Sequence, residues 1–178
     1  MASHLVHSVT AAEAPATERP VLDHLLQLYF HDFSELAALG SPYGEVDENG
    51  LFGYSPSLDS YWREADHIPL LIRADGHIAG FVLLHRWSAL DRPLDRAVAE
   101  FFVLRKYRRA GVGTRAAHLV FRRYPGRWEV PVADYNPDAL RFWRTVVRSL
   151  SIAEIVEHAG DGRRWSGVVL CFASGPTE

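Results

Sequence analysis

The chain has 178 residues, a formal net charge of −3 and a single cysteine, Cys171. This length favours one domain, 1–178, that can bury a core without metals or disulfides. One cysteine excludes an intramolecular disulfide and a zinc cluster, and it fits a reducing cytoplasm. The charge argues against general nucleic-acid binding. No run approaches ~18 apolar residues and no basic start precedes an apolar run, so neither a membrane span nor a signal peptide is expected.

The first third of the chain predicts one strand, one helix and a long loop. Residues 4–9 are expected to form the strand. The segment 18–40 predicts the helix, because its apolar residues recur at helical spacing, with Pro20 near the start and Gly40 just past the end. Residues 41–62 contain glycines, prolines and many aromatics, and they predict a loop with a short helix near its end.

The rest of the chain alternates between strand and helix patterns. Residues 68–86 hold two β-rich runs divided by Asp75-Gly76, a dipeptide typical of hairpin turns. The later elements are expected as a strand at 96–104, a helix at 114–124, a strand at 127–133, a helix at 136–150 and a hairpin of strands at 151–158 and 164–173. Hairpins at both ends of a β-α-β-α centre predict an α/β (α+β) fold, with helices on the faces of a mixed sheet.

Positive charge gathers where the strand at 96–104 runs into the next helix. The cations and glycines of this junction are Arg105, Lys106, Arg108, Arg109, Gly111 and Gly113. The first N–H groups of a helix lack internal partners, and together with the helix dipole they attract anions, phosphate above all. Glycine lets the main chain approach such an anion closely. The junction therefore predicts a phosphate-binding turn.

Other phosphate or nucleic-acid motifs fit the junction less well. A nucleoside-triphosphate loop would need a lysine after Gly113, where the chain has Thr114. A dinucleotide fingerprint would need Ala116 as its third glycine and Glu129 as its acid, and the preceding antiparallel hairpin disfavours it. A nucleic-acid patch is disfavoured because Tyr107 is the one aromatic among the loop cations.

The segment Arg108-Arg109-Ala110-Gly111-Val112-Gly113 resembles the R/Q-x-x-G-x-G/A loop of the GNAT superfamily of N-acetyltransferases. Phe101–Val103 is similar to the strand that holds the pantetheine arm in that family, and the segment that starts at Asn136 is similar to its next motif. The resemblance covers about 4–173 and is specific over about 98–148. It implies a mostly antiparallel sheet of about six to seven strands, splayed between residues 99–104 and 127–132, with helices on both faces.

The resemblance also implies acetyl-CoA as co-substrate and no metal. Backbone N–H groups around 109–114 would hold the pyrophosphate, and the main chain near Val103 would pair with the pantetheine. The implied cofactor-binding residues are Phe102, Val103, Arg108, Arg109, Ala110, Gly111, Val112, Gly113, Thr114 and Asn136. The alternatives are a solvated basic turn whose glycines only admit the helix, and an Asn136 that only caps the next helix ahead of Pro137.

Glu100 is the candidate base. Transfer to an amine requires a group that takes the amine proton, and the resemblance implies a glutamate on this strand. Alternation places Glu100 and Phe102 on one face and Phe101 and Val103 on the other, and a local bulge could re-aim the glutamate. The alternative is a carboxylate paired with a nearby arginine.

The sequence assigns no residue as the general acid that would protonate the thiolate leaving group. Trp143 stands where many family members have a tyrosine, and an indole cannot release its proton at useful pH. Tyr135 or Tyr107 could serve instead, or the thiolate could leave unprotonated, since a thiol of pKa ~8.5 does not require an acid.

The family resemblance implies that the first helix and the loop after it line the pocket for the acceptor amine. The acids and aromatics of this loop are Tyr43, Glu45, Asp47, Glu48, Phe52, Tyr54, Tyr61 and Trp62. They suit a cationic amine with an apolar body, or the aromatics pack onto the sheet while the acids face water. The nine histidines are scattered, and the pair His4 and His7 has no third ligand nearby. Cys171 is expected in the core.

The sequence leaves two functions open. The leading one is an acetyl-CoA-dependent N-acetyltransferase that acts on a small molecule or on a peptide or protein amino group. The other is a coenzyme A-binding sensor without catalysis. No nucleic-acid or membrane partner is expected, and a homodimer is left open, as is the identity of the acceptor.

Overall fold

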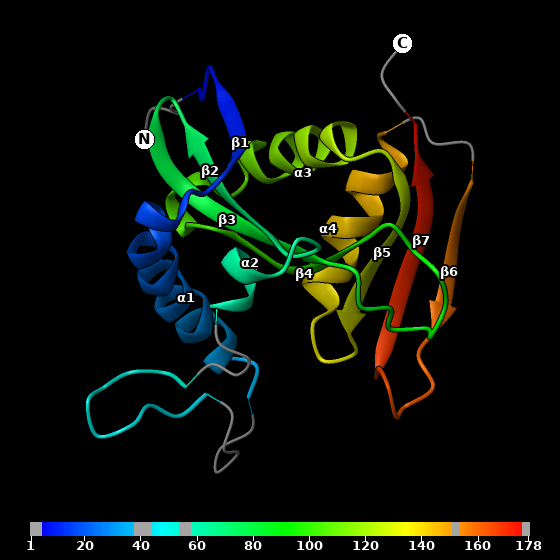
Figure 1. Ribbon diagram of the computed structural model, residues 1–178, viewed down its shortest axis with the longest axis horizontal. Coiled ribbons are helices and arrows are strands. Elements are labelled where there is room, and N and C mark those ends of the chain that lie inside the picture. Colours follow the sequence, from blue (N-terminus) through cyan, green and yellow to red (C-terminus); the bar gives the residue numbers. More distant parts are fainter. Residues whose placement is uncertain (1–4, 38–43, 54–57, 151–153, 176–178) are drawn as a thin grey trace.

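The computed structural model describes residues 5–37, 44–53, 58–150 and 154–175 (Figure 1). His4, Gly40, Tyr43 and Tyr54, named above, lie outside these ranges, as do residues 151–153 of the strand expected at 151–158. Within the described residues no helix is both long and apolar enough to cross a membrane.

The strands form one sheet of seven in the order β1-β2-β3-β4-β5-β7-β6. All neighbouring pairs run antiparallel except β4 and β5, which are parallel. This arrangement confirms the mixed, mostly antiparallel sheet. The strands are β1 (Val9–Glu13), β2 (Ile68–Ala74), β3 (His77–His85), β4 (Arg96–Val103), β5 (Gly126–Ala133), β6 (Ile155–Ala159) and β7 (Gly167–Ser174).

The first strand lies later than expected. It spans Val9–Glu13 and so shares only Val9 with the expected strand at 4–9, and it pairs with β2 from Val9 opposite Ala74. The residues just before it make a different contact, because the N–H groups of His7 and Ser8 donate to Asp75 Oδ1 at 3.0 and 2.7 Å. Asp75 belongs to the β2–β3 turn, so this part of the chain fastens that turn instead of extending the strand.

That turn is the one the sequence predicts. Asp75 and Gly76 connect β2 to β3 and have φ angles of 48° and 80°. Positive φ at both central residues defines the type I′ geometry that matches strand twist in two-residue hairpins.

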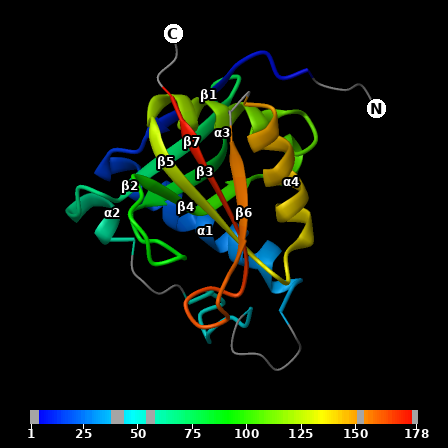
Figure 2. The ribbon, with the colours of Figure 1, turned by 90° about the vertical axis from the view of Figure 1, so that its right-hand side faces the viewer.

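Helices cover both faces of the sheet, as predicted (Figures 1 and 2). They are α1 (Arg19–Ser34), α2 (Ser60–Arg63), α3 (Val112–Arg123) and α4 (Pro137–Arg148). In Figure 2 the strands run between α2 on the left and α4 on the right. Helix α1 ends at Ser34, earlier than the pattern up to Gly40 suggested.

Each face of the sheet has its own hydrophobic core. On the α3 and α4 face the buried residues include Phe121, Trp128, Trp143 and Leu170. On the α1 and α2 face they include Leu22, Tyr29, Tyr61, Phe81 and Phe102. Residues that alternate along one strand therefore enter different cores, and β4 supplies both.

Candidate active site

The sheet opens between its two parallel strands. Strands β4 and β5 pair through Arg96 with Trp128 and Ala97 with Glu129, and the ladder ends there. Beyond this point β4 continues along β3, while β5 continues along β7 to its last residue, Ala133. This opening agrees with the splay that the family resemblance implies. Among the described residues it leaves one edge of β4 without a neighbouring strand after Ala97.

A tight turn carries the chain from the end of β4 into α3. A short 3₁₀ helix spans Arg105–Tyr107, and Arg109 and Gly111 then have φ angles of 61° and 74°. Gly111 is the N-cap of α3 and has no side chain to bond the helix start. The first helical bond runs from the Arg115 N–H to the Gly111 carbonyl at 3.0 Å. The N–H groups of residues 112–114 precede it and are those that a helix leaves for an external acceptor.

The two glycines of the turn have different surroundings. A Cβ added at Gly111 would meet nothing within 4 Å, so the main chain there faces open space. A Cβ added at Gly113 would lie 3.2 Å from the Phe142 ring on α4 and 3.6 Å from a Val103 methyl group. Gly111 therefore leaves room for a ligand, and Gly113 lets α3 approach α4 closely.

The cations of the junction are divided between protein partners and solvent. Asp32 of α1 binds both Arg105, at 2.8 Å, and Arg108. The Arg108 Nε also donates to the Val103 carbonyl at 2.7 Å. Lys106 and Arg109 are exposed and form no ion pair with any residue that the structure describes. Of the two predicted phosphate-binding arginines, Arg109 is thus the uncommitted one.

Glu100 lies on the face of the sheet that α1 covers, the same face as Phe102, as the strand alternation predicts. The β3–β4 register shifts between the pairs Leu83–Glu100 and Leu84–Val98, which leaves Ala99 as the extra residue of a bulge. Tyr29 of α1 donates its hydroxyl to Glu100 Oε2. Within the described chain no arginine pairs with Glu100, so the alternative of an arginine ion pair is wrong.

The environment of Glu100 changes its acidity. Burial raises the pKa of the Glu100 carboxyl from 4.5 to about 7, although the hydrogen bond from Tyr29 lowers it. A carboxyl with a pKa near neutrality can exchange protons at physiological pH. General bases have this property.

Trp143, Tyr107 and Tyr135, named above in connection with the acid, and the predicted cap Asn136 have different surroundings. Trp143 is buried, with its ring centroid 4.9 Å from that of Phe101 and 5.0 Å from that of Phe142. Tyr107 packs against the α3 and α4 core, whereas Tyr135 is 57% exposed. Asn136 accepts a hydrogen bond from the Ala139 N–H at 3.1 Å, which confirms it as the N-cap of α4. Trp143 is accordingly a packing residue.

Several side chains connect the described part of the loop at 41–62, which the sequence predicts on the acceptor side, to the rest of the fold. Gln27 of α1 exchanges two hydrogen bonds with the main chain of Phe52, at 3.1 and 2.8 Å. The Trp62 indole donates to the Ala14 carbonyl at 3.0 Å, and Tyr61 is buried. Glu45, Asp47 and Glu48 are exposed. The described aromatics pack onto the fold, and the acids face solvent.

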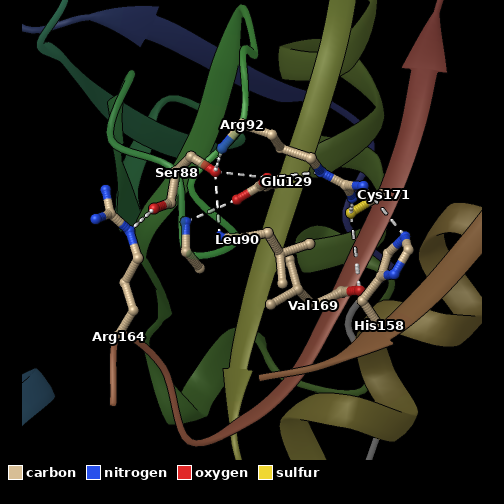
Figure 3. Close-up of polar contacts among 9 residues, drawn as sticks. Ser88, Leu90, Arg92, Glu129, His158, Arg164, Val169 and Cys171 are labelled. Carbon is tan, nitrogen blue, oxygen red and sulfur yellow. Dashed lines mark hydrogen bonds and ion pairs between the residues drawn. The ribbon is translucent and has the colours of Figure 1, made fainter. Parts of the chain in front are cut away.

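Glu129 anchors the segment between β3 and β4. It is 1% exposed, and it accepts hydrogen bonds from the Ser88 hydroxyl, the Ala89 N–H and Arg92 Nε at 2.9, 2.8 and 3.3 Å. Figure 3 shows Arg92 reaching on to Cys171 and His158. Glu129, which a dinucleotide fingerprint would use as its acidic residue, therefore has a structural role. Cys171 is half-buried and contacts Arg92, so it is not the core residue that the sequence predicted.

Replacing Glu129 by alanine is expected to lower the free energy of unfolding by about 2–4 kcal/mol, since it leaves a buried N–H and a hydroxyl without their acceptor. Urea denaturation at pH 7 measures the change. Glu154→Ala is the matched control, because Glu154 is an exposed lining residue of the cavity of about 630 Å³ beside this cluster. Equal losses in the two variants would contradict the anchoring role.

Two side chains of this site escaped the sequence interpretation. In the helix pattern of 18–40, Tyr29 is one of the apolar positions and Asp32 is a polar one. They lie one helical turn apart on α1, where Tyr29 contacts Glu100 and Asp32 contacts Arg105 and Arg108. Their spacing in the helix was visible, but the partners lie some 70 residues away in sequence, and no local pattern connects them.

Comparison with known proteins places this geometry in a family. The acetyltransferase (GNAT) family model matches residues 22–146. No curated protein matches the chain by sequence. Among solved structures, the fold is similar to a GNAT-family acetyltransferase from Staphylococcus aureus Mu50 (11% identity, 94% of this chain and 100% of that chain, TM-score 0.60). It is also similar to the ribosomal-protein-S18-alanine N-acetyltransferase from Escherichia coli (13%, 96% and 97%, 0.54).

A third similar fold is the spermidine N-acetyltransferase from Vibrio cholerae, solved in complex with CoA and spermine (10% identity, 93% of this chain and 95% of that chain, TM-score 0.56). At such identities these likenesses concern the fold. The family model covers more than two thirds of the sequence, from the first turn of α1 to the last turn of α4. The chain belongs to the acetyltransferase (GNAT) family.

Proposed function

We propose that this protein is an acetyl-CoA-dependent N-acetyltransferase that transfers the acetyl group directly to a primary amine of a small molecule, peptide or protein. The observation that carries the proposal is the joint position of two features on β4. Glu100, with a pKa of about 7, lies on the strand edge that opens from β5, and an uncapped helix start lies at the end of the same strand. Family membership supports acetyl transfer.

The turn after β4 suits the diphosphate of coenzyme A. The N–H groups of residues 112–114 would donate to it, the open space over Gly111 would admit it, and the uncommitted Arg109 would add charge. Ala110 would contribute its main chain. Arg108 would serve indirectly, because its bonds to Asp32 and Val103 hold the turn in place.

The open edge of β4 suits the pantetheine arm. Phe102 points its side chain into the α1-side core, so it would contribute main-chain groups only, as would Val103. Asn136 would act by holding the start of α4 on the far side of the opening. When bound, acetyl-CoA would supply an acetyl group activated as a thioester.

Glu100 would act as the general base. It would take the proton that the amine nitrogen loses as this nitrogen bonds to the acetyl carbon and the carbon–sulfur bond breaks. The carboxyl must be ionised to accept that proton, so activity should rise with pH through about 7. No side chain is assigned as acid, because a thiol of pKa ~8.5 can leave as thiolate.

A coenzyme A-binding sensor is the second candidate. It is favoured by the buried Trp143, which stands where a proton-donating tyrosine is common in the family and offers no such proton. The turn and the open strand edge are equally compatible with this function.

Free-thiol release from acetyl-CoA in the presence of an amine panel separates the two candidates. The panel includes polyamines and alanine-containing peptides, because the solved structures similar to this one include a spermidine N-acetyltransferase and a ribosomal-protein-S18-alanine N-acetyltransferase. An enzyme releases thiol and yields an acetylated amine by mass spectrometry. A sensor binds acetyl-CoA in calorimetry yet releases no thiol with any acceptor.

A further inference from the structure

Tyr29 lies at the centre of the aromatic cluster on the α1 face of the sheet. Its ring centroid is 4.5 Å from that of Phe33, 5.4 Å from Phe30, and 5.8 Å from each of Phe81 and Phe102. The residue is 7% exposed. Rings packed from α1, β3 and β4 restrict the ring of Tyr29, and they therefore fix where its hydroxyl points.

That hydroxyl meets the carboxylate of the candidate base. It donates to Glu100 Oε2, and Glu100 reaches α1 at the bulge that Ala99 makes in β4. Cross-strand from Glu100 is Leu83, an apolar residue that offers the carboxylate no polar group. The side-chain contact that orients Glu100 thus comes from a separately packed helix.

We propose that Tyr29 is the positioning residue of Glu100, which holds the carboxylate in its ionised, base-competent form through the hydroxyl hydrogen bond. The inference rests on the proposed function, because it assigns Tyr29 to the reaction that Glu100 would perform. It assigns no contact with substrate to Tyr29.

Three other titratable groups face the same side of the sheet, and each makes contacts with residues other than Glu100. Asp32, one turn further along α1, is bound by Arg105 and Arg108. His85 lies two residues along β3 from Leu83 and packs against the His67 and Trp87 rings. Glu129 on β5 is bonded to Ser88, Ala89 and Arg92. Burial and Tyr29 are the two influences that set the acidity of Glu100.

The Tyr29 hydroxyl determines the direction in which the pKa of Glu100 changes. A hydrogen bond from a neutral hydroxyl to a carboxylate favours the ionised form and lowers the carboxyl pKa. Removing the hydroxyl while keeping the ring should therefore raise the pKa of Glu100 above about 7. Glu100 would then be ionised, and able to act as a base, only at higher pH.

The test is Tyr29→Phe in the full chain, with kcat/KM measured from about pH 5.5 to about pH 9.5, a range that includes the expected ionisation near 7. The acidic limb is expected to move up by about one pH unit, so the loss below pH 6 exceeds the loss on the high-pH plateau about tenfold. Tyr124→Phe is the matched control, because Tyr124 donates a similar bond to Glu13 at 2.5 Å on the other face of the sheet. It should leave the limb in place.

A second measurement does not depend on activity. The Glu100 carboxyl carbon is titrated by NMR in protein labelled with ¹³C at glutamate side chains, with Glu100→Gln used to assign the signal. If the pKa of Glu100 in Tyr29→Phe equals that in the unmodified protein, the inference is overturned. It is also overturned if kcat/KM of Tyr29→Phe falls by the same factor at every pH. A shifted titration in a protein whose activity shows no ionisation near it supports the Tyr29 contact and overturns the base assignment of Glu100.

Discussion

Glu100→Gln is expected to lower kcat at pH 8 by about 10²–10⁴-fold while leaving the affinity for acetyl-CoA within about twofold. Glutamine keeps the shape of the side chain and can still accept the Tyr29 hydrogen bond through its amide oxygen, but it cannot take a proton. The turn that we propose binds the diphosphate lies beyond the end of β4, so it should be unaffected. Steady-state kinetics and calorimetry measure the two quantities.

Stability provides the control for this variant. The pKa of Glu100 is raised in the folded protein, from 4.5 to about 7. Its contribution to stability is therefore fully present below pH 4.5 and lost as pH rises through 7, by about 3 kcal/mol at most. Glutamine does not ionise, so Glu100→Gln should be at least as stable as the unmodified protein at pH 8. If Glu100→Gln keeps the full turnover of the unmodified protein at pH 8, Glu100 is not the general base.

Gly111→Glu is expected to abolish detectable acetyl-CoA binding, a weakening of about 100-fold or more. The new carboxylate would project from the helix N-cap into the open space assigned to the diphosphate, and like charges in one anion site repel each other. The fold should persist, since a Cβ there meets nothing within 4 Å. The left-handed backbone at φ 74° adds a strain of about 1–2 kcal/mol.

Gly111→Gln separates charge from strain. It has the same backbone strain and nearly the same size as Gly111→Glu, so it should retain measurably more affinity for acetyl-CoA. Calorimetric titration of the two variants beside the unmodified protein makes the comparison. Equal affinity in all three would show that the cofactor binds elsewhere.

Local signals predicted the parts of the fold that depend on local chemistry. Asp75-Gly76 forms its turn because its φ angles suit that dipeptide, and Asn136 caps α4 because its side chain reaches the Ala139 N–H. The splay between β4 and β5 came instead from the family resemblance, since nothing in the composition of either strand requires the ladder to stop after Ala97.

Contacts between distant segments could not be predicted in the same way. The start of β1 depends on Asp75 binding the N–H groups of His7 and Ser8, a contact that joins residues more than 60 positions apart. The commitment of Arg108 to Asp32, which leaves Arg109 for an anion, depends on how α1 packs over the sheet. The bond from Tyr29 to Glu100 has the same origin.

The most direct measurement is a crystal structure of the protein with bound coenzyme A. We predict that the diphosphate lies within hydrogen-bond distance of the N–H groups of residues 112–114, beside Arg109, and that the pantetheine arm lies along the open edge of β4. A coenzyme A molecule held at any other place, with the start of α3 facing only solvent, would contradict this prediction.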